Sequence, residues 1–180
     1  MRHRMILKLK RTPGIYLVGF MASGKTTIGR MLADELGWAF ADVDEDIEAA
    51  DGRAIAEIFD TDGEQNFREI EHAALRKRVR EVERGKPMVV ALGGGAFAQE
   101  ANHGLLEDNG VTIWLDCPFP KVCARVEGTT HRPLARDTGK FKQLYEDRRE
   151  AYRKAEHRIE IEGDDPAAIV AAILKLPIFS

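Results

Sequence analysis

The segment Gly19-Phe20-Met21-Ala22-Ser23-Gly24-Lys25-Thr26 has the spacing of a phosphate-binding loop, G-x-x-x-x-G-K-[ST]. Glycines let the backbone curl so that successive N–H groups point at phosphate oxygens, and the N-terminus of a following helix adds positive potential at the same place. Lys25 would supply a point charge for the β- and γ-phosphates, and the Thr26 hydroxyl would bind Mg²⁺. The segment therefore predicts a binding site for ATP or GTP.

The rest of the chain narrows the kind of nucleotide-binding protein. GTPases carry an Asn/Thr-Lys-x-Asp segment that reads guanine, and the sequence contains none. Motor and transport ATPases place an acidic residue at the end of a second apolar strand, but the apolar run Met88–Leu92 ends in Gly93-Gly94-Gly95. The carboxylate that supports the metal must therefore come from elsewhere.

Asp42-Val43-Asp44 follows the apolar run Trp38–Ala41 and supplies candidates for this carboxylate. Side chains alternate along an extended chain, so both carboxylates would lie on one side. One would hold Mg²⁺ through water, and the other would accept hydrogen bonds from substrate hydroxyls. The alternative is that Asp44 caps the following helix and the acidic run through Asp51 is a solvated face.

Further candidates are the glycine triplet and several arginines. Three glycines in succession permit close approach of the backbone to a flat or anionic ligand, although an ordinary turn is the alternative. Arg68 lies on a predicted helix with Glu71 one turn later, Arg132 lies in a long nonperiodic stretch, and Arg148 lies in a charged helix. Each arginine alone is as compatible with a solvated surface.

The elements that position these residues are short apolar runs alternating with longer amphipathic stretches. The sequence predicts strands at residues 15–18, 38–41, 88–92, 111–115 and 158–161, and helices at residues 25–36, 63–84, 118–125, 141–155 and 166–176, with a further helix around residues 105–106. Such alternation implies right-handed crossovers and a parallel five-stranded sheet covered on both faces, a three-layer α/β/α fold. Ligands bind beyond the carboxyl ends of such strands, where the candidate residues lie.

Composition excludes several other classes of protein. The chain has 180 residues, 44% hydrophobic and 32% charged, with a formal net charge of −3, which argues against disorder and against a general nucleic-acid binder. Its two cysteines, Cys117 and Cys123, cannot form a disulfide framework or a four-ligand zinc site. No window approaches the roughly 18–20 apolar residues of a membrane span. We expect a cytoplasmic monomer with a basic leader at residues 1–12, one domain at 13–180, and a lid at about 126–140.

Taken in order, the motifs resemble the shikimate kinase family. The phosphate loop is followed by Asp42-x-Asp44, by Gly63-Glu64-x-x-Phe67-Arg68-x-x-Glu71, by the glycine triplet, by Arg132-Pro133-Leu134 and by Arg148-x-x-x-Tyr152. The resemblance runs from about Ile15 to the C-terminus and is much more specific than the phosphate loop alone. It implies a P-loop kinase fold with a lid, Mg²⁺ as cofactor, and transfer of the ATP γ-phosphate to the 3-hydroxyl of shikimate.

The resemblance also implies roles for single residues. Lys25, Asp44 and Arg132 would be catalytic, with Asp44 as the proposed base. ATP would contact Ala22, Ser23, Gly24, Lys25, Thr26, Thr27, Arg125, Arg132 and Pro166. Shikimate would contact Asp44, Phe59, Phe67, Arg68, Gly93, Gly94, Gly95 and Arg148, with Glu71 orienting the arginines. Thr26 would hold Mg²⁺ directly and Asp42 through water.

The sequence departs from the family pattern at a few positions, and two other functions stay open. Ala22 and Thr26 stand where Gly and Ser are frequent, and Arg149-Glu150-Ala151 lacks a frequent proline. The chemistry of the residues also fits another P-loop kinase for a small molecule: gluconate, an aminoshikimate or a nucleoside monophosphate. A catalytically silent nucleotide-binding module would usually lack Lys25, Asp44 or Arg132, and all three are present.

Overall fold

The core of the molecule is a parallel sheet of five strands in the order β2-β3-β1-β4-β5. The computed structural model describes residues 14–127 and 138–179. The strands are β1 (Gly14–Val18), β2 (Ala39–Asp42), β3 (Met88–Ala91), β4 (Val111–Asp116) and β5 (His157–Glu160). The three central strands are buried along their whole length, as expected for a sheet covered on both faces. The predicted fold class is confirmed.

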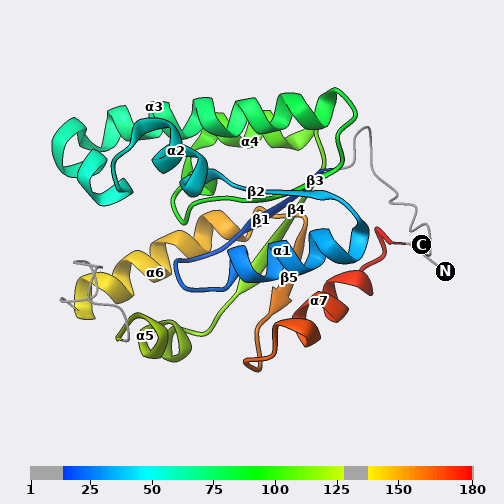
Figure 1. Cartoon of the computed structure of the whole chain (residues 1–180). Helices are drawn as coiled ribbons and strands as arrows, with labels where there is room; N and C mark the ends of the chain where they lie inside the picture. The colour runs from blue at the N-terminus through cyan, green and yellow to red at the C-terminus, as the bar shows by residue number, and fades with distance from the viewer. Residues whose placement is uncertain (1–13, 128–137, 180) are drawn as a thin grey trace.

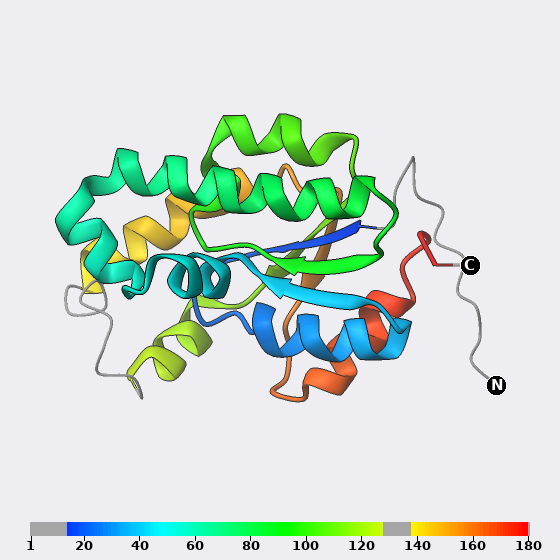
Figure 2. The ribbon, with the colours of Figure 1, turned by 45° about the horizontal axis from the view of Figure 1, so that its top comes forward.

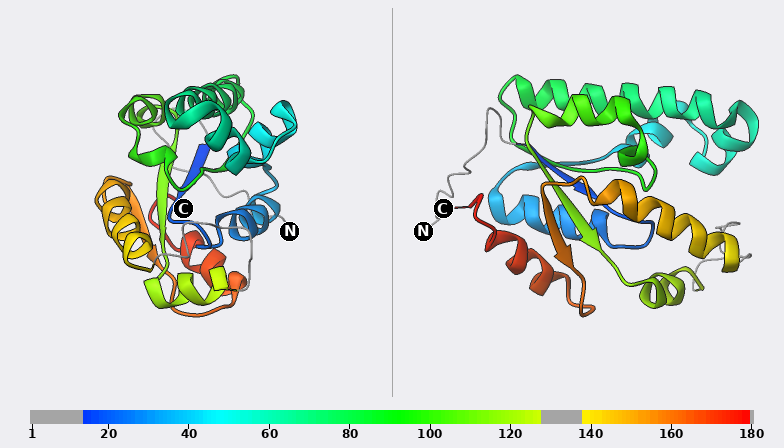
Figure 3. Two further views of the ribbon diagram at one scale, coloured as in Figure 1. Left: turned by 90° about the vertical axis from the view of Figure 1, so that its left-hand side faces the viewer. Right: turned by 180° about the vertical axis from the view of Figure 1, so that it is seen from behind.

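Helices cover both faces of this sheet. They are α1 (Lys25–Leu36), α2 (Val43–Asp51), α3 (Ile55–Glu83), α4 (Glu100–Glu107), α5 (Phe119–Glu127), α6 (Thr138–Tyr152) and α7 (Pro166–Leu174), with a short 3₁₀ turn, η1 (Ala96–Ala98). In Figure 1, α3 and α4 lie above the sheet, whereas α1 and α7 lie below it. Figure 2 and the end-on view in Figure 3 show the same layers from other directions.

Several helix ends lie where glycine or proline predicted them. Gly37 follows α1 in the left-handed conformation (φ 69°), and Pro166 is the first residue of α7, whose N-terminus is capped by Asp165. The second strand begins at Ala39 and not at Trp38, because Gly37 and Trp38 close the end of α1 with backbone hydrogen bonds.

The largest departure from the prediction concerns α3. A helix was predicted to begin at Gly63, but α3 already begins at Ile55 and continues to Glu83. Gly63 interrupts it with a non-helical backbone (φ 82°, ψ 164°) that only glycine adopts without strain. The first eight residues therefore form a separate helical segment that is turned away from the rest at Gly63, and this segment carries Phe59.

Two predictions fall on parts of the chain that the structure does not describe. These are the basic leader at residues 1–12 and most of the lid, including Arg132. Within the described residues, no helix is both long enough and apolar enough to cross a lipid bilayer.

Candidate active site

The phosphate loop connects the central strand β1 to α1. Ala22 has a left-handed backbone (φ 61°), and Gly24 (φ 93°) immediately precedes the first residue of α1. The Lys25 ammonium folds over the loop and donates to the carbonyl oxygens of Gly19 at 2.8 Å and Phe20 at 2.9 Å. The loop therefore places a helix N-terminus and a lysine charge at the carboxyl end of the sheet, the arrangement that binds phosphate.

Asp42 and Thr26 form the next part of the site. The Thr26 hydroxyl donates to Asp42 Oδ2 at 2.6 Å. The other oxygen of Asp42 accepts from the backbone N–H of Glu45 at 3.2 Å and so caps α2. The capping considered for Asp44 is thus performed by Asp42.

The predicted alternation of Asp42 and Asp44 along a strand is wrong. α2 begins directly at Val43, so Asp42 is the last strand residue and Asp44 lies in the first turn of the helix. The two carboxylates are nevertheless close enough that the charge of Asp42 acts on Asp44. The helix turn, and not strand pleating, brings them together.

A hydroxyl and a carboxylate are the hard oxygen donors that Mg²⁺ prefers, and the protein usually supplies only one or two of them beside water and phosphate. Thr26 and Asp42 fit such a site. Within residues 14–127 and 138–179 no three His, Cys, Asp or Glu side chains gather as a metal-binding group. The protein therefore offers a partial magnesium site that nucleotide phosphates would complete.

Asp44 lies against the glycine triplet that follows β3. A Cβ added to Gly93 would lie 2.7 Å from Asp44 Oδ1 and 3.2 Å from Glu71 Oε2, so any larger residue would displace the Asp44 carboxylate. Burial raises the pKa of Asp44 to about 6, with further contributions from the charges of Asp42 and Glu71, while Lys25 acts in the opposite direction. A carboxylate with such a pKa near neutrality is suited to accept a proton.

Two arginines from different helices meet at the same glycine loop. A Cβ on Gly95 would collide with the guanidinium groups of both Arg68 and Arg148. It would lie 2.7 Å from Arg68 Nη1 and still closer to Arg68 Nη2 and Arg148 Nη1. Arg148 also donates to the carbonyl of Gly94 at 3.4 Å. The glycines thus leave room for two planar cations side by side, a suitable receptor for a carboxylate.

The buried carboxylate of Glu71 interacts with both Arg68 and Arg148. Its side chain is 1% exposed and accepts from Arg68 Nη1 at 2.9 Å. Burial raises the pKa of Glu71, and the charges of Arg68 and Arg148 oppose this shift. Arg68 Nε is buried and has no hydrogen-bond partner among the described residues.

Aromatic side chains flank the arginines. Phe59 and Phe67 lie with ring centroids 4.4 Å apart, and the Arg68 guanidinium lies over both rings. Tyr152, one helical turn beyond Arg148, donates from its hydroxyl to the carbonyl of Gly94. In the motif Arg148-x-x-x-Tyr152, the four-residue spacing places both side chains on one face of α6, which is the signal in the sequence for this contact.

Of the two residues outside the phosphate loop, α1 and the lid that are expected to contact ATP, Arg125 and Pro166, Arg125 lies against the phosphate loop. Arg125 donates to the carbonyl of Ala22 at 2.8 Å and pairs with Asp164 at 3.6 Å. That ion pair brings the segment preceding Pro166 towards the loop. Thr27 is exposed in the first turn of α1.

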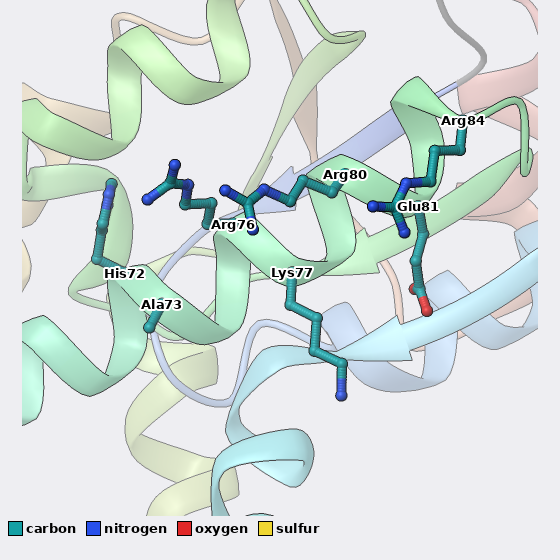
Figure 4. A pocket seen from close by; sticks show the side chains of 7 residues that line it. All are labelled: His72, Ala73, Arg76, Lys77, Arg80, Glu81 and Arg84. Carbon is teal, nitrogen blue, oxygen red and sulfur yellow. The ribbon is translucent and has the colours of Figure 1, made fainter.

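A surface cavity of about 400 Å³ lies elsewhere, along the outer face of α3 (Figure 4). It is lined by His72, Ala73, Arg76, Lys77, Arg80, Glu81 and Arg84. None of these residues is an expected site residue, and six of the seven belong to α3, with Arg84 directly after it. The chemistry of the described site is therefore assigned to the glycine loop, α2, α3 and α6, and not to this cavity.

The comparisons with known proteins agree with this geometry. The family model for shikimate kinase matches residues 21–176. The chain is 42% identical over 161 residues to the shikimate kinase of Persephonella marina, covering 89% of this chain and 96% of that protein. It is also 42% identical over 166 residues to that of Synechococcus elongatus, covering 90% and 85%. The structure of the Acinetobacter baumannii shikimate kinase in complex with shikimate superposes with a TM-score of 0.83 at 35% identity, covering 92% of this chain and 93% of that chain.

Proposed function

The chain belongs to the shikimate kinase family, and on that premise we propose how its residues divide the reaction of ATP with shikimate to ADP and shikimate 3-phosphate. This reaction is a step towards chorismate and the aromatic amino acids. The family match favours shikimate over gluconate or a nucleoside monophosphate as the acceptor.

The phosphate loop holds ATP. Backbone N–H groups from Ala22 to Thr27 bind the β- and γ-phosphates, and Lys25 leaves its carbonyl partners to follow the charge on the transferring group. Arg125 and Pro166 contact the nucleoside side. Arg132, outside the described residues, supplies the lid cation that neutralises the phosphoryl group.

The acceptor lies on the other side of the glycine triplet. Arg68 and Arg148 bind the shikimate carboxylate with paired N–H donors, and Phe59 and Phe67 wall the ring. Gly93, Gly94 and Gly95 line the floor. Asp44 accepts a hydrogen bond from the 3-hydroxyl, orients its oxygen towards the γ-phosphorus and takes the proton as the new P–O bond forms.

Thr26 and Asp42 would hold Mg²⁺, Thr26 by its hydroxyl and Asp42 through water. The ion would supply positive charge to the phosphate groups during transfer. The protein's own part is the hydrogen bond of 2.6 Å that keeps the Thr26 hydroxyl of α1 beside the Asp42 carboxylate at the end of β2.

The observation that carries the proposal is the convergence of Asp44, Arg68 and Arg148 on one glycine loop beside the phosphate loop. A Cβ on Gly94 would lie 3.5 Å from the backbone nitrogen of Met21, which is a phosphate-loop residue. A basic receptor for a carboxylate and a base for an alcohol thus lie within reach of the nucleotide.

The test is a coupled assay of ADP release with Mg²⁺ and ATP. Shikimate, an aminoshikimate, gluconate and a nucleoside monophosphate are offered in parallel at equal concentration. We expect rapid turnover with shikimate, none with gluconate or the monophosphate, and none with shikimate after chelation of Mg²⁺. Faster turnover with any of the other acceptors would overturn the assignment of the substrate.

A further inference from the structure

Helix α6, which carries Arg148, packs through a small number of large aromatic side chains, whose rings contact Phe20, Trp114 and Phe119. Of its fifteen residues only Phe141, Tyr145 and Tyr152 are buried. These rings hold the helix against its neighbours, and polar contacts of its other side chains add to this packing.

Those contacts come from Arg149, the neighbour of Arg148. Consecutive helix residues point about 100° apart, so Arg148 faces the glycine loop while Arg149 points from a different face of the helix. There Arg149 pairs with Asp116 at the end of β4, with Nη1–Oδ1 at 2.5 Å and Nη2–Oδ2 at 3.3 Å. Its guanidinium lies 4.9 Å from the ring centroid of Trp114.

A second connection runs through Tyr145. Arg149 Nη1 donates to the Tyr145 hydroxyl at 3.0 Å, and that hydroxyl donates to the carbonyl of Cys117 at 2.7 Å. Asp116 is only 7% exposed and Arg149 19%, so this is a largely buried pair with good geometry. The network attaches α6 to β4, the rigid neighbour of the phosphate-loop strand.

Asp116 has a second arginine that provides a matched control. Arg158 from the edge strand β5 donates to Asp116 Oδ2 at 2.8 Å from Nε and 2.6 Å from Nη2, and it also lies over Trp114. Its strand, β5, contains none of the expected site residues. Loss of either arginine leaves Asp116 paired with the other, so neither substitution leaves the buried carboxylate without a cation.

We propose that Arg149 and Asp116 are positioning residues that set the place of Arg148 and thereby the affinity for the carboxylate of the acceptor. This inference rests on the proposed role of Arg148. We expect the main effect on the acceptor half, because β1 is held in the sheet by its pairing with β3 and β4. A smaller effect on the nucleotide half is expected, since the ring of Phe20 in the phosphate loop packs against Phe141 and Tyr145 of α6.

The experiment compares Arg149→Gln with Arg158→Gln in the full-length protein. Shikimate affinity is measured by calorimetric titration, together with the Michaelis constants for both substrates and the midpoint of thermal unfolding. We expect Arg149→Gln to weaken shikimate binding about tenfold, a typical size for coupling through a packed element, with a smaller change in the KM for ATP. Arg149→Lys should restore part of the affinity, and Arg158→Gln should leave it at the wild-type value.

A general loss of stability is separated from positioning by a double substitution. If Arg149 acts through Arg148, Arg149→Gln has no further effect on shikimate affinity in an Arg148→Gln background. Additive effects, or an equal loss of affinity in Arg158→Gln, would overturn the inference. Unchanged affinity in Arg148→Gln alone would instead show that the proposed role of Arg148 is wrong.

Discussion

The two halves of the active site are built in different ways. The phosphate-binding part of the nucleotide half is one contiguous segment, Gly19–Thr26, whose own backbone turns and the start of α1 create the binding surface. The acceptor half is assembled from α2, the long helix α3, the loop after β3 and α6. The first half is a local structure, and the second exists only when distant helices pack correctly.

This difference predicts a difference in sensitivity. A helix N-terminus and backbone N–H groups have little freedom to move relative to one another. Arg68 and Arg148, in contrast, are long side chains held in place by Glu71 and by the packing of two helices. Substitutions in the acceptor half should therefore change acceptor binding and turnover while ATP binding stays intact.

The largest effect is expected from Asp44→Asn. The amide cannot take the proton of the acceptor hydroxyl, so kcat should fall by roughly a thousandfold, within the usual range for a general base. ATP binding, measured by titration with a non-hydrolysable analogue, should be unchanged. Glu45→Gln is the matched control, because it removes a neighbouring charge from an exposed side chain of α2 and should leave kcat unaltered. Near-normal turnover in Asp44→Asn would remove this residue from the mechanism.

Arg68→Lys should have the next largest effect. Lysine keeps the charge but loses the planar pair of donors, so shikimate binding should weaken by roughly 1.5–3 kcal/mol. Calorimetric titration with shikimate measures this change. Arg78→Lys is the control on the same helix: Arg78 also forms a two-bond pair, with Asp46 at 2.7 Å for both bonds, but it lies away from the site. Equal losses in the two variants would contradict a specific role for Arg68.

The free energy of unfolding should depend on pH because the Asp44 carboxylate is buried. The folded pKa of Asp44, about 6, is above the ordinary value of 3.8, so the folded state binds this proton more tightly than the unfolded chain. The free energy of unfolding therefore decreases as pH rises between about 4 and 6, and the full cost remains above 6. Asp44→Asn escapes this cost and should be more stable at pH 7.5 by on the order of 2 kcal/mol.

Urea unfolding in the presence of a chelator, at several pH values, checks this prediction. The difference between wild type and Asp44→Asn should shrink towards zero near pH 4, where the carboxyl group is protonated in both states. A constant difference at every pH would show that it arises from something other than titration. If Asp44→Asn is more stable but inactive, the buried carboxylate of Asp44 contributes to function and lowers the stability of the protein.

The sequence predicted the two halves unequally, for the same structural reason. The phosphate loop is contiguous, and the helix ends at Gly37 and Pro166 follow from single residues, so local rules were sufficient. The prediction that Asp44 lies on an extended strand was wrong, because nothing in Asp42-Val43-Asp44 distinguishes the end of a strand from the start of a helix. The early start of α3 had a signal, since Ile55, Ile58 and Phe59 recur at helical spacing, but the segment was short. The pairing of Arg149 with Asp116 spans 33 residues and no local pattern indicates it.

The smallest effect is expected from replacing an alanine of the nucleotide half by glycine. The sign of the change in the free energy of unfolding should depend on the backbone conformation of the alanine that is replaced. Ala22 has φ 61°, a left-handed conformation that costs an L-residue about 1 kcal/mol, whereas glycine adopts it freely. Part of this gain is offset by the greater freedom of glycine in the unfolded chain, so Ala22→Gly should raise the free energy of unfolding by about 0.5 kcal/mol. Ala50→Gly, the same change at an exposed helical position of α2, should lower it by about 0.5–1 kcal/mol. Because the loop already has the phosphate-binding turn, the KM for ATP should be the same in both variants. Destabilisation by Ala22→Gly would mean that the turn forms only around the nucleotide, and the nucleotide half would then be no more preformed than the acceptor half.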